Sequence, residues 1–456
     1  MSTTLTYPAA ASITTTTSTS PSALTAERSS STIVIRSLSP PSPALPLPFK
    51  LTDIDLLRRD CHVHGEWIPS RSKERFAVLD PGTGRIWATC PDATKEDVGP
   101  TVKSSFAAFQ GFSTSCSPRE RARLLTSWHH LILSSRLDLA KILVHETGKP
   151  QTEALAEVDY GASLVRWFAT EAESIEPTAS FPLPPPAFPI PSPTSDNAAP
   201  APGTFPKKRG AFLKQPVGVV LALVPWSFPL AIALRKSAAA LAAGCTVIVK
   251  PSSETPLTAL ALACLADRAG FPAGVLNVLT TSLGNTPVVS EALCRHPLVK
   301  ARLSLDLGGN CPFIVFDDAD LEQTARDLTA LKWRHAGQAC VAPNRCYVQR
   351  RVYVAFAKLL VAEARKLKLG HGMVEETTLG PLTTIRGLYK AEALCKDADD
   401  KGAVKLLGTG RRELDDGYFM SPTVLVGMTD SMLMCREEVF APVLGLYVFD
   451  TEDEVA

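Results

Sequence analysis

The sequence predicts an α/β protein built around a parallel sheet with helices on both faces. Between residues 216 and 279, three short, continuous apolar runs alternate with two longer segments in which apolar residues recur at helical spacing. Turn residues separate these segments. Strands that are apolar on both faces are typical of parallel sheets, which helices bury on either side.

The first fifty residues differ in composition from the rest. They are rich in Ser, Thr and Pro, and their first acidic residue is Glu27. Such a segment buries too little apolar surface to fold alone, so we expect residues 1–50 to be disordered. The composition also suits a mitochondrial transit peptide, but no basic residue precedes Arg28. We therefore expect a cytoplasmic protein, with a mitochondrial one as the alternative.

From Leu51 the chain has the pattern of a folded domain. Short strands are predicted at residues 65–68 and 76–80, and the Pro-Gly-Thr-Gly turn at 81–84 follows the second. Four helices with apolar stripes come next, at residues 95–109, 118–134, 137–147 and 152–172.

Residues 176–208 interrupt this pattern with a dense run of prolines. Proline lacks the backbone N–H that a helix or a central strand requires. An extended or disordered surface insertion is therefore predicted, in preference to a polyproline docking ligand.

The core of the predicted sheet follows. Strands are expected at residues 216–225, 245–250 and 275–279, with helices at 229–243 and 256–269 between them. Ligands of such sheets bind beyond the carboxyl ends of the strands. Polar residues stand at all three of these ends, which favours a nucleotide-binding crevice: Trp226-Ser227, Lys250 and residues 280–284.

A candidate nucleophile follows a helix predicted at residues 321–333. Cys340 stands after Gly337, and its neighbour Ala339 is small, which leaves the thiol approachable. Only an accessible thiolate is a useful nucleophile.

Composition excludes several other classes of protein. The chain of 456 residues is 45% hydrophobic and 20% charged, with a formal net charge of +1, so neither nucleic acid nor an anionic membrane is an expected partner. No apolar run approaches the ~20 residues of a membrane span. Eleven scattered cysteines do not form a disulfide framework. Cys61, His62 and His64 lie close together, but no second ligand cluster follows, so no metal site is expected.

Several motifs in consistent order resemble those of aldehyde dehydrogenases, most closely the succinate-semialdehyde branch. The similarity runs from about Leu56 to the last residue. The matching motifs are PWSFP at 225–229, LAAGCTVIVKPSSETP at 241–256, FPAGVLNV at 271–278, LDLGGNCPFIVFDDADL at 305–321, GQAC at 337–340 and EEVFAP at 437–442. Any one of them is weak, whereas together they are specific.

The resemblance implies a catalytic cycle at Cys340. In the family this cysteine attacks the aldehyde carbon to give a thiohemiacetal, and hydride transfer to the cofactor leaves a thioester. A Glu in the family's ELGG motif activates the hydrolytic water, and Asp306 takes that position here. An Asn amide of PWNFP helps to hold the oxyanion, and Ser227 replaces it with a shorter side chain.

The resemblance also implies NAD or NADP as the cofactor. Thr281 replaces a glycine that lets the backbone approach the cofactor. Ser253 takes the position of an acid that favours NAD, so NADP is at least tolerated. The residues expected to contact the cofactor are Trp226, Lys250, Ser253, Gly284, Glu438 and Phe440.

Two arginines define the expected substrate class. Arg235 and Arg334 match the pair that clamps the distal carboxylate in succinate-semialdehyde enzymes, and the guanidinium fork suits bidentate binding of a carboxylate. The alternative for each is a pairing with a nearby acid. The expected partner is a small aldehyde.

The chain is also shorter than the family pattern. The family carries a strand, a Gly-Ser-Thr turn and a helix between the positions of Lys300 and Leu303, where its helix N-terminus binds the cofactor diphosphate. The sequence also ends at Ala456, before the family's final strand, so little or no oligomerisation arm is expected although the family oligomerises. We predict an incomplete NAD(P)-binding domain at 51–305 and a truncated catalytic domain at 306–456.

Two interpretations follow. In the first, the chain oxidises succinate semialdehyde with NAD(P)+ through Cys340. In the second, it is a catalytically impaired remnant of the fold that acts as a binding or interaction protein, because Ser227, Asp306 and Thr281 depart from the family pattern.

Overall fold

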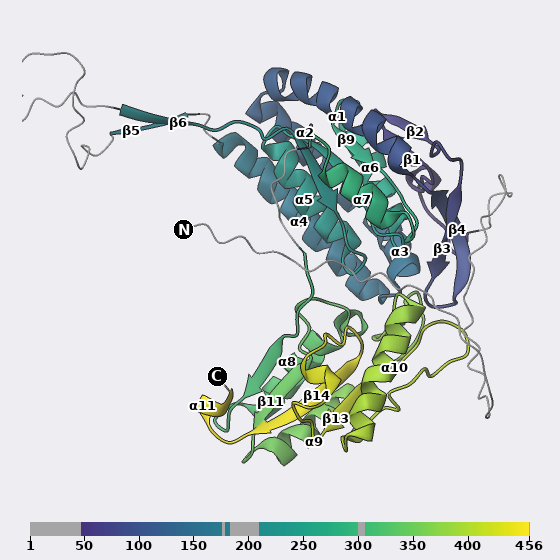
Figure 1. Ribbon diagram of the computed structural model, residues 1–456, viewed down its shortest axis with the longest axis vertical. Helices are drawn as coiled ribbons and strands as arrows, with labels where there is room; N and C mark the ends of the chain where they lie inside the picture. The colour runs from purple at the N-terminus through teal and green to yellow at the C-terminus, as the bar shows by residue number, and fades with distance from the viewer. Residues whose placement is uncertain (1–46, 176–177, 183–208, 300–305, 456) are drawn as a thin grey trace, which may run out of the picture. The chain divides into compact units, whose positions relative to one another are not determined.

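The computed structural model describes residues 47–175, 178–182, 209–299 and 306–455. Of residues 1–50, which we expected to be disordered, 1–46 lie outside these described residues, as do the proline-rich stretch at 183–208 and the junction at 300–305. Residues 47–50 are described, and Phe49 packs against Trp87 and His145, which corrects the prediction at that end. Figure 1 labels most of the helices and strands named below.

The first sheet has five strands in the order β2-β1-β9-β8-β7. Three neighbouring strands, β7, β8 and β9, pair in parallel, as the sequence predicts. Two short antiparallel strands then extend the sheet on the β9 side. The strands are β1 (Cys61–Val63), β2 (Glu66–Ile68), β7 (Val219–Leu223), β8 (Thr246–Lys250) and β9 (Leu276–Val278).

Seven helices belong to the same part of the chain (Figure 1). Their ends follow local chemistry: Ser117 forms a capping box at the start of α2, and Gly148 and Gly270 adopt left-handed conformations that end α3 and α6. The helices are α1 (Lys95–Ser115), α2 (Pro118–Ser134), α3 (Arg136–Thr147), α4 (Gln151–Ser174), α5 (Pro229–Ala242), α6 (Pro256–Ala269) and α7 (Thr286–Cys294).

Strand β7 is less buried than its apolar sequence predicts. Two of its five residues are buried, two are partly exposed, and Leu223 is 38% exposed. Within the described residues, a single bridge to Val299 is its outer pairing. The prediction of a fully buried strand is therefore wrong, because β7 lies at an edge of the described sheet.

Two antiparallel hairpins flank this part. One consists of β3 (Arg75–Asp80) and β4 (Arg85–Pro91). The other pairs β5 (Thr178–Pro182) with β6 (Arg209–Leu213). We expected residues 176–208 to form an extended or disordered loop, so the strand at Thr178–Pro182 corrects this prediction. Proline is tolerated there because the hairpin has only two strands, and both are edges.

The second sheet follows the order β10-β11-β14-β13-β12 and is parallel except for β12. In Figure 1 helices α8, α9 and α10 lie beside it. The strands are β10 (Pro312–Val315), β11 (Arg345–Gln349), β12 (Val404–Leu407), β13 (Thr423–Val426) and β14 (Val443–Phe449). The helices are α8 (Leu321–Lys332), α9 (Tyr353–Ala364), α10 (Ile385–Asp400) and the short α11 (Glu452–Val455), with 3₁₀ turns η1 (Ile54–Leu56), η2 (Arg334–Gly337) and η3 (Leu433–Cys435).

Candidate active site

Cys340 is exposed, in a tight turn that begins where α8 ends. Three consecutive residues before it, His335, Ala336 and Gly337, have positive φ angles of 49°, 52° and 74°. A Cβ on Gly337 would overlap the carbonyl oxygen of Ala441, so only glycine fits this position. The backbone therefore presents the cysteine outward in a conformation that side chains rarely adopt.

The segment before β10 runs beside Cys340. The thiol of Cys311 donates to the Cys340 carbonyl oxygen at 3.4 Å. A Cβ on Gly309 would lie 3.7 Å from that same oxygen, and one on Gly308 would overlap the carboxylate of Glu438. The two glycines of the LDLGG motif thus bring the nucleophile and Glu438 close to one segment of the chain, the one that precedes β10.

The residues expected at the nicotinamide end of the cofactor also meet. Trp226 and Phe440 pack edge to face with ring centroids 5.3 Å apart. Glu438 Oε1 is buried and has no hydrogen-bond partner among the described residues. A buried carboxylate oxygen without a donor is costly, and a ribose hydroxyl would supply one. This end of the site therefore fits the cofactor.

The adenosine side is occupied by internal hydrogen bonds. Lys250 Nζ donates to the Pro251 carbonyl at 3.1 Å and to Thr286 Oγ1 at 2.8 Å. Burial lowers the pKa of Lys250 to about 8. Thr281 is 1% exposed, and its hydroxyl lies 2.9 Å from that of Thr286. The hydroxyls of this loop thus bind one another and the lysine.

Two further residues expected at the cofactor have other surroundings. Ser253 donates to the carboxylate of its neighbour Glu254 at 2.9 Å, and Arg386 pairs with Glu254 at 3.1 Å. Gly284 lies in an exposed loop before α7. Glu254 therefore supplies an acid directly after Ser253, which takes the position of the family's NAD-favouring acid.

Ser227 is 8% exposed, and its loop is held from beneath by a buried ion pair. Lys149 Nζ donates to the Ser227 carbonyl at 3.0 Å and pairs with Glu157; the side chains of both charged residues are 1% exposed. Glu157 in turn accepts from the backbone N–H groups of Leu230 and Ala231 at 3.0 and 3.2 Å. One buried pair thus fixes both this loop and the start of α5.

Asp306, at the position of the family's general base, is exposed and forms an ion pair with Lys236 at 2.5 Å. Lys236 lies on α5, one residue after the predicted substrate ligand Arg235. The pair connects the segment before β10 to the helix that starts the PWSFP motif.

The two predicted carboxylate ligands are held by aromatic rings. Arg235 is exposed, and it donates to the Tyr160 hydroxyl at 2.7 Å. The guanidinium carbon of Arg334 lies 4.9 Å from the centre of the Phe228 ring. Lys149 Nζ also lies over the Phe228 ring, 4.4 Å from its centre. Cation–π contacts of this kind fix an arginine while leaving N–H donors for a ligand.

Sequence reasoning missed the charged residues that support the site, which are Lys149, Glu157 and Lys236. A partial signal exists for Lys149, because it directly follows the helix-ending Gly148 in a stretch whose residues are buried. No local pattern reveals that it reaches a carbonyl 78 positions away.

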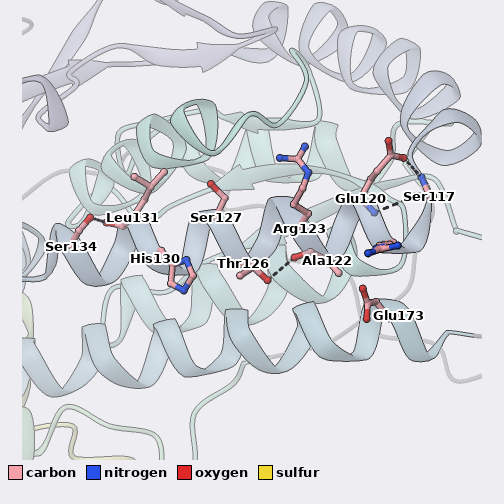
Figure 2. Close-up of a pocket in the computed structure, with 11 residues that line it drawn as sticks. Ser117, Glu120, Ala122, Arg123, Thr126, Ser127, His130, Leu131, Ser134 and Glu173 are labelled. Atoms are coloured by element: carbon pink, nitrogen blue, oxygen red, sulfur yellow. Dashed lines mark hydrogen bonds between the residues drawn. The ribbon is translucent and has the colours of Figure 1, made fainter.

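A pocket of about 970 Å³ lies elsewhere, on α2 and the end of α4. Figure 2 shows Ser117, Arg123 and His130 on α2 lining it, together with Glu173 from α4. None of its lining residues is a predicted site residue. The volume of this pocket therefore does not identify it as the active site.

The Cys61–His64 cluster is engaged in the first sheet. The ring nitrogens of His62 lie 3.1 Å from the Leu276 carbonyl and 2.8 Å from Asp267. Cys61 contacts the Thr280 hydroxyl at 3.4 Å. These side chains are thus directed to separate partners.

Comparison with known proteins decides the family. The sequence model described as the aldehyde dehydrogenase family matches residues 67–301 and 300–456. The chain belongs to the aldehyde dehydrogenase family. The match comes in two pieces that meet at residues 300–301.

Characterised relatives of this aldehyde dehydrogenase act on small aldehydes according to their names. A 3-sulfolactaldehyde dehydrogenase of Pseudomonas putida is 39% identical over 89% of this chain and 83% of its own length. A mitochondrial succinate-semialdehyde dehydrogenase of Mus musculus is 38% identical over 88% of this chain and 76% of its own.

The fold is confirmed by a solved structure. A succinate-semialdehyde dehydrogenase from Burkholderia pseudomallei superposes with a TM-score of 0.81 at 37% identity, covering 89% of this chain and 84% of that one. The expected α/β architecture and the family resemblance are therefore both confirmed. The family uses NAD(P)+, as expected. None of the described helices is long and apolar enough to cross a membrane.

Proposed function

We propose that this aldehyde dehydrogenase oxidises a small aldehyde with a distal anionic group, succinate semialdehyde in the first instance, to the corresponding acid. The observation that carries the proposal is the exposed Cys340, which follows the left-handed turn of residues 335–337 and lies beside Gly309, while the neighbouring Gly308 lies against Glu438. Relatives named for a semialdehyde and a sulfonated aldehyde support the anionic class.

The chain's own residues provide the covalent steps. The Cys340 thiolate forms a C–S bond to the aldehyde carbon, and the carbonyl oxygen becomes an oxyanion. The Cys340 backbone N–H and the Ser227 hydroxyl are the expected donors to that oxygen. When bound, NAD(P)+ accepts the hydride. Asp306 then takes a proton from the water that attacks the thioester, which releases the acid and the thiolate.

Asp306 and Ser227 set the speed of this cycle. The Asp306 carboxylate must leave Lys236 or share it in order to accept a proton. The Ser227 hydroxyl is shorter than an amide side chain, and losing one oxyanion donor typically costs about 10²–10³ in kcat. We therefore expect slow turnover.

Arg235 and Arg334 give the proposed selectivity for an anionic aldehyde. Arg334 lies in the turn that leads to Cys340, and Arg235 lies on α5, which follows Ser227. A hydrogen bond to a charged group contributes about 1.5–3 kcal/mol. Removing either arginine should therefore raise KM about 10- to 100-fold for the anionic aldehyde and leave a neutral one unchanged.

The test measures NAD(P)H formation by the full-length chain with succinate semialdehyde, and with butanal as the neutral counterpart. The variants are Cys340→Ala, Arg235→Met and Arg334→Met, with Arg351→Met as the control because its side chain is 84% exposed. Equal losses on both aldehydes in the two site variants would contradict the assignment of the anion site. Absence of turnover by folded parent protein would reject the activity.

The alternative is a catalytically impaired aldehyde dehydrogenase that acts as a binding or interaction protein. The ion pair of Asp306 with Lys236 and the buried, hydrogen-bonded Thr281 favour it. An activated ester separates the two, since acylation of Cys340 needs no cofactor. A burst in the parent that Cys340→Ala lacks, without NAD(P)H formation from aldehyde, supports impairment. Steady turnover with tight binding of NAD(P)+ rules it out.

A further inference from the structure

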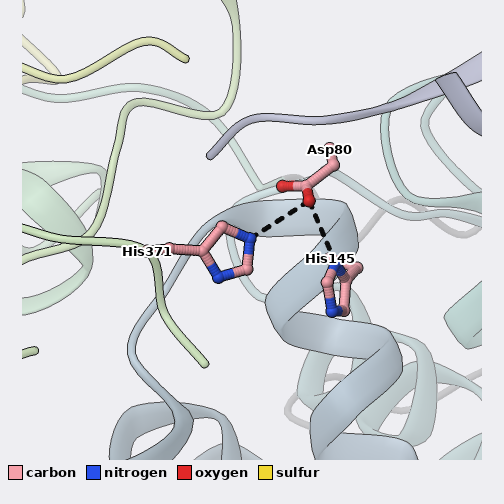
Figure 3. Close-up of side chains that lie close together, drawn as sticks. All are labelled: Asp80, His145 and His371. Carbon is pink, nitrogen blue, oxygen red and sulfur yellow. Dashed lines mark hydrogen bonds and ion pairs between the residues drawn. The ribbon is translucent and has the colours of Figure 1, made fainter. Parts of the chain in front are cut away.

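A carboxylate and two histidines meet at a point that the aldehyde chemistry does not use (Figure 3). Asp80 ends β3, His145 is in the last turn of α3, and His371 stands between α9 and α10. Asp80 Oδ2 lies 3.1 Å from His145 Nδ1 and 3.1 Å from His371 Nε2. These three atoms all lie within 4.8 Å of one another.

The cluster is buried and its side chains are held in place. Asp80 and His145 are each 3% exposed, and the His371 side chain is 22% exposed. The backbone N–H of Gly82 donates to Asp80 Oδ1 at 2.8 Å, which directs Oδ2 at the two rings. The His145 ring stacks on Phe49 with centroids 4.4 Å apart. A Cβ on Gly82 would overlap the His371 ring, so glycine admits that imidazole.

We propose that Asp80, His145 and His371 bind one divalent transition-metal ion of the Zn²⁺ type. Two imidazole nitrogens and a carboxylate oxygen are ligands that Zn²⁺ takes at about 2.0–2.2 Å. Tetrahedral bonds of that length separate ligand atoms by about 3.3 Å. The two separations of 3.1 Å already match, and the third must close by at most about 1.5 Å, which rotation of the partly exposed His371 ring supplies.

Binding requires a rearrangement of protons. Without an ion, the Met373 N–H donates to His371 Nδ1 at 3.1 Å, which places the His371 proton on Nε2, facing Asp80. A metal on Nε2 moves this proton to Nδ1, and the Met373 hydrogen bond is given up. On His145 the proton moves to Nε2, a buried atom with no partner among the described residues. Binding of the ion must therefore compensate for one lost backbone hydrogen bond, and the two ring nitrogens that face Asp80 must lose their protons before their lone pairs can bind the metal.

The site would act as a structural tie between three segments. Asp80 belongs to the β3–β4 hairpin and His145 to α3, whereas His371 begins the segment whose Gly372 and Gly380 pack on the backbone of residues 148–149. Two of the ligands are separated by 291 residues in sequence. An ion bound only by the folded chain stabilises it by an amount that grows with the logarithm of the ratio of ion concentration to Kd, so the melting temperature should rise with added metal.

The test uses full-length protein freed of metal by a chelator, with accessible thiols blocked by iodoacetamide because cysteines also bind these ions. Zn²⁺ binding is measured by equilibrium dialysis, and Co²⁺ binding by the visible absorption of a four-coordinate ion. His371→Asn and Asp80→Asn remove ligands. His296→Asn is the matched control, because His296 Nδ1 also accepts a hydrogen bond from the backbone two residues later, at 3.3 Å from Leu298 N.

We expect one equivalent of metal in the parent and in His296→Asn, with binding at least about tenfold weaker in His371→Asn and Asp80→Asn. Zn²⁺ should raise the melting temperature of the first two proteins only. No stoichiometric binding by the parent, or equal binding by all four proteins, would overturn the proposal. The three side chains would then form only the hydrogen bonds seen in the structure.

If both ligand variants fail to fold, X-ray absorption of the Zn²⁺-loaded parent decides. A shell of nitrogen and oxygen with two imidazoles supports the site, and a shell containing sulfur overturns it. None of these measurements depends on aldehyde turnover. A negative result for the metal site therefore leaves the proposed function untouched, and the reverse also holds.

Discussion

Lys332 is a buried cation whose direct partner is neutral. Its side chain has 0% exposure, and Nζ donates to the Asn344 side-chain oxygen at 2.8 Å. Burial lowers the pKa of Lys332 from its ordinary 10.5 to about 7, although the charge of Glu438 acts in the opposite direction. The folded chain therefore releases a proton from Lys332 at a much lower pH than the unfolded chain does.

This difference predicts a pH-dependent stability. Between about pH 7 and 10.5 the unfolded state binds more protons at this position, so the contribution of Lys332 to the free energy of unfolding rises with pH across that window. Compared with Lys332→Met, the parent should gain stability between about pH 7 and 9 in urea unfolding. The exposed Lys358→Met is the control, and its difference from the parent should stay constant. A constant difference for Lys332→Met as well would contradict the prediction.

Also at the scale of single residues, the substitutions at the site have different structural consequences. Ser227 keeps its loop position because the backbone carbonyl, not the side chain, is held by Lys149. Asp306 keeps the negative charge of the family's carboxylate, but that carboxylate forms an ion pair with Lys236. The residue types alone predict that both side chains reach less far than their family counterparts. The ion pair of Asp306 and the hydrogen bond to the Ser227 carbonyl join residues 70 and 78 positions apart, which no local pattern reveals.

At the scale of elements, the turn of residues 334–337 determines whether Cys340 is accessible. Its left-handed backbone costs about 1–2 kcal/mol per residue that is not glycine, and the surrounding packing sustains it. His335 in this turn is buried, with its backbone N–H donating to Glu153 at 2.7 Å. Burial, with the nearby charges of Lys149 and Arg334, keeps the pKa of His335 well below its ordinary range.

Gly337→Ala is predicted to disrupt this turn. The added Cβ would meet the Ala441 carbonyl at a positive φ, so unfolding free energy should fall by at least about 1–2 kcal/mol. The rate at which iodoacetamide labels Cys340, followed by mass spectrometry, should change as well. Gly111→Ala adds a methyl group in open space on helix α1, and it should stabilise the chain by about 0.5–1 kcal/mol without altering labelling. Unchanged labelling in Gly337→Ala would show that the turn does not control the thiol.

The elements themselves were largely predictable. The bounds of α2 and α6 agree with the predicted residues 118–134 and 256–269, because a proline begins each helix and, for α6, Gly270 ends it. Residues 178–182 were not predicted as a strand, since their partner β6 begins only at Arg209 and prolines obscure any alternation. The partly exposed edge of β7 was equally hidden, because burial of a strand depends on its neighbours in the sheet.

At the scale of the molecule, small residues allow the segment before α10 to contact the end of α3. A Cβ on Gly380 would overlap the Gly148 carbonyl, and one on Gly372 would overlap that of Lys149. Thr383 donates to the Thr147 carbonyl at 2.7 Å, and both residues are buried. This backbone-to-backbone contact lies beside Lys149, the cation that supports the Ser227 loop.

Gly380→Ala should therefore weaken the chain as a whole. Forcing a methyl group into this contact typically costs about 1–3 kcal/mol, and the melting temperature should fall accordingly. Gly99→Ala, where a Cβ meets nothing within 4 Å, serves as the comparison in calorimetry. Equal melting temperatures for the two variants would show that the close contact does not contribute to stability.

The buried carboxylate of Glu157 has a consequence for hydrogen exchange. The first N–H groups of a helix normally lack partners and exchange with water readily as the end frays. At the start of α5, the amides of Leu230 and Ala231 instead donate to a carboxylate whose side chain is 1% exposed. Their deuterium uptake should be as slow as that of amides in the middle of α5, so the loop carrying Ser227 is anchored to a helix end that does not open.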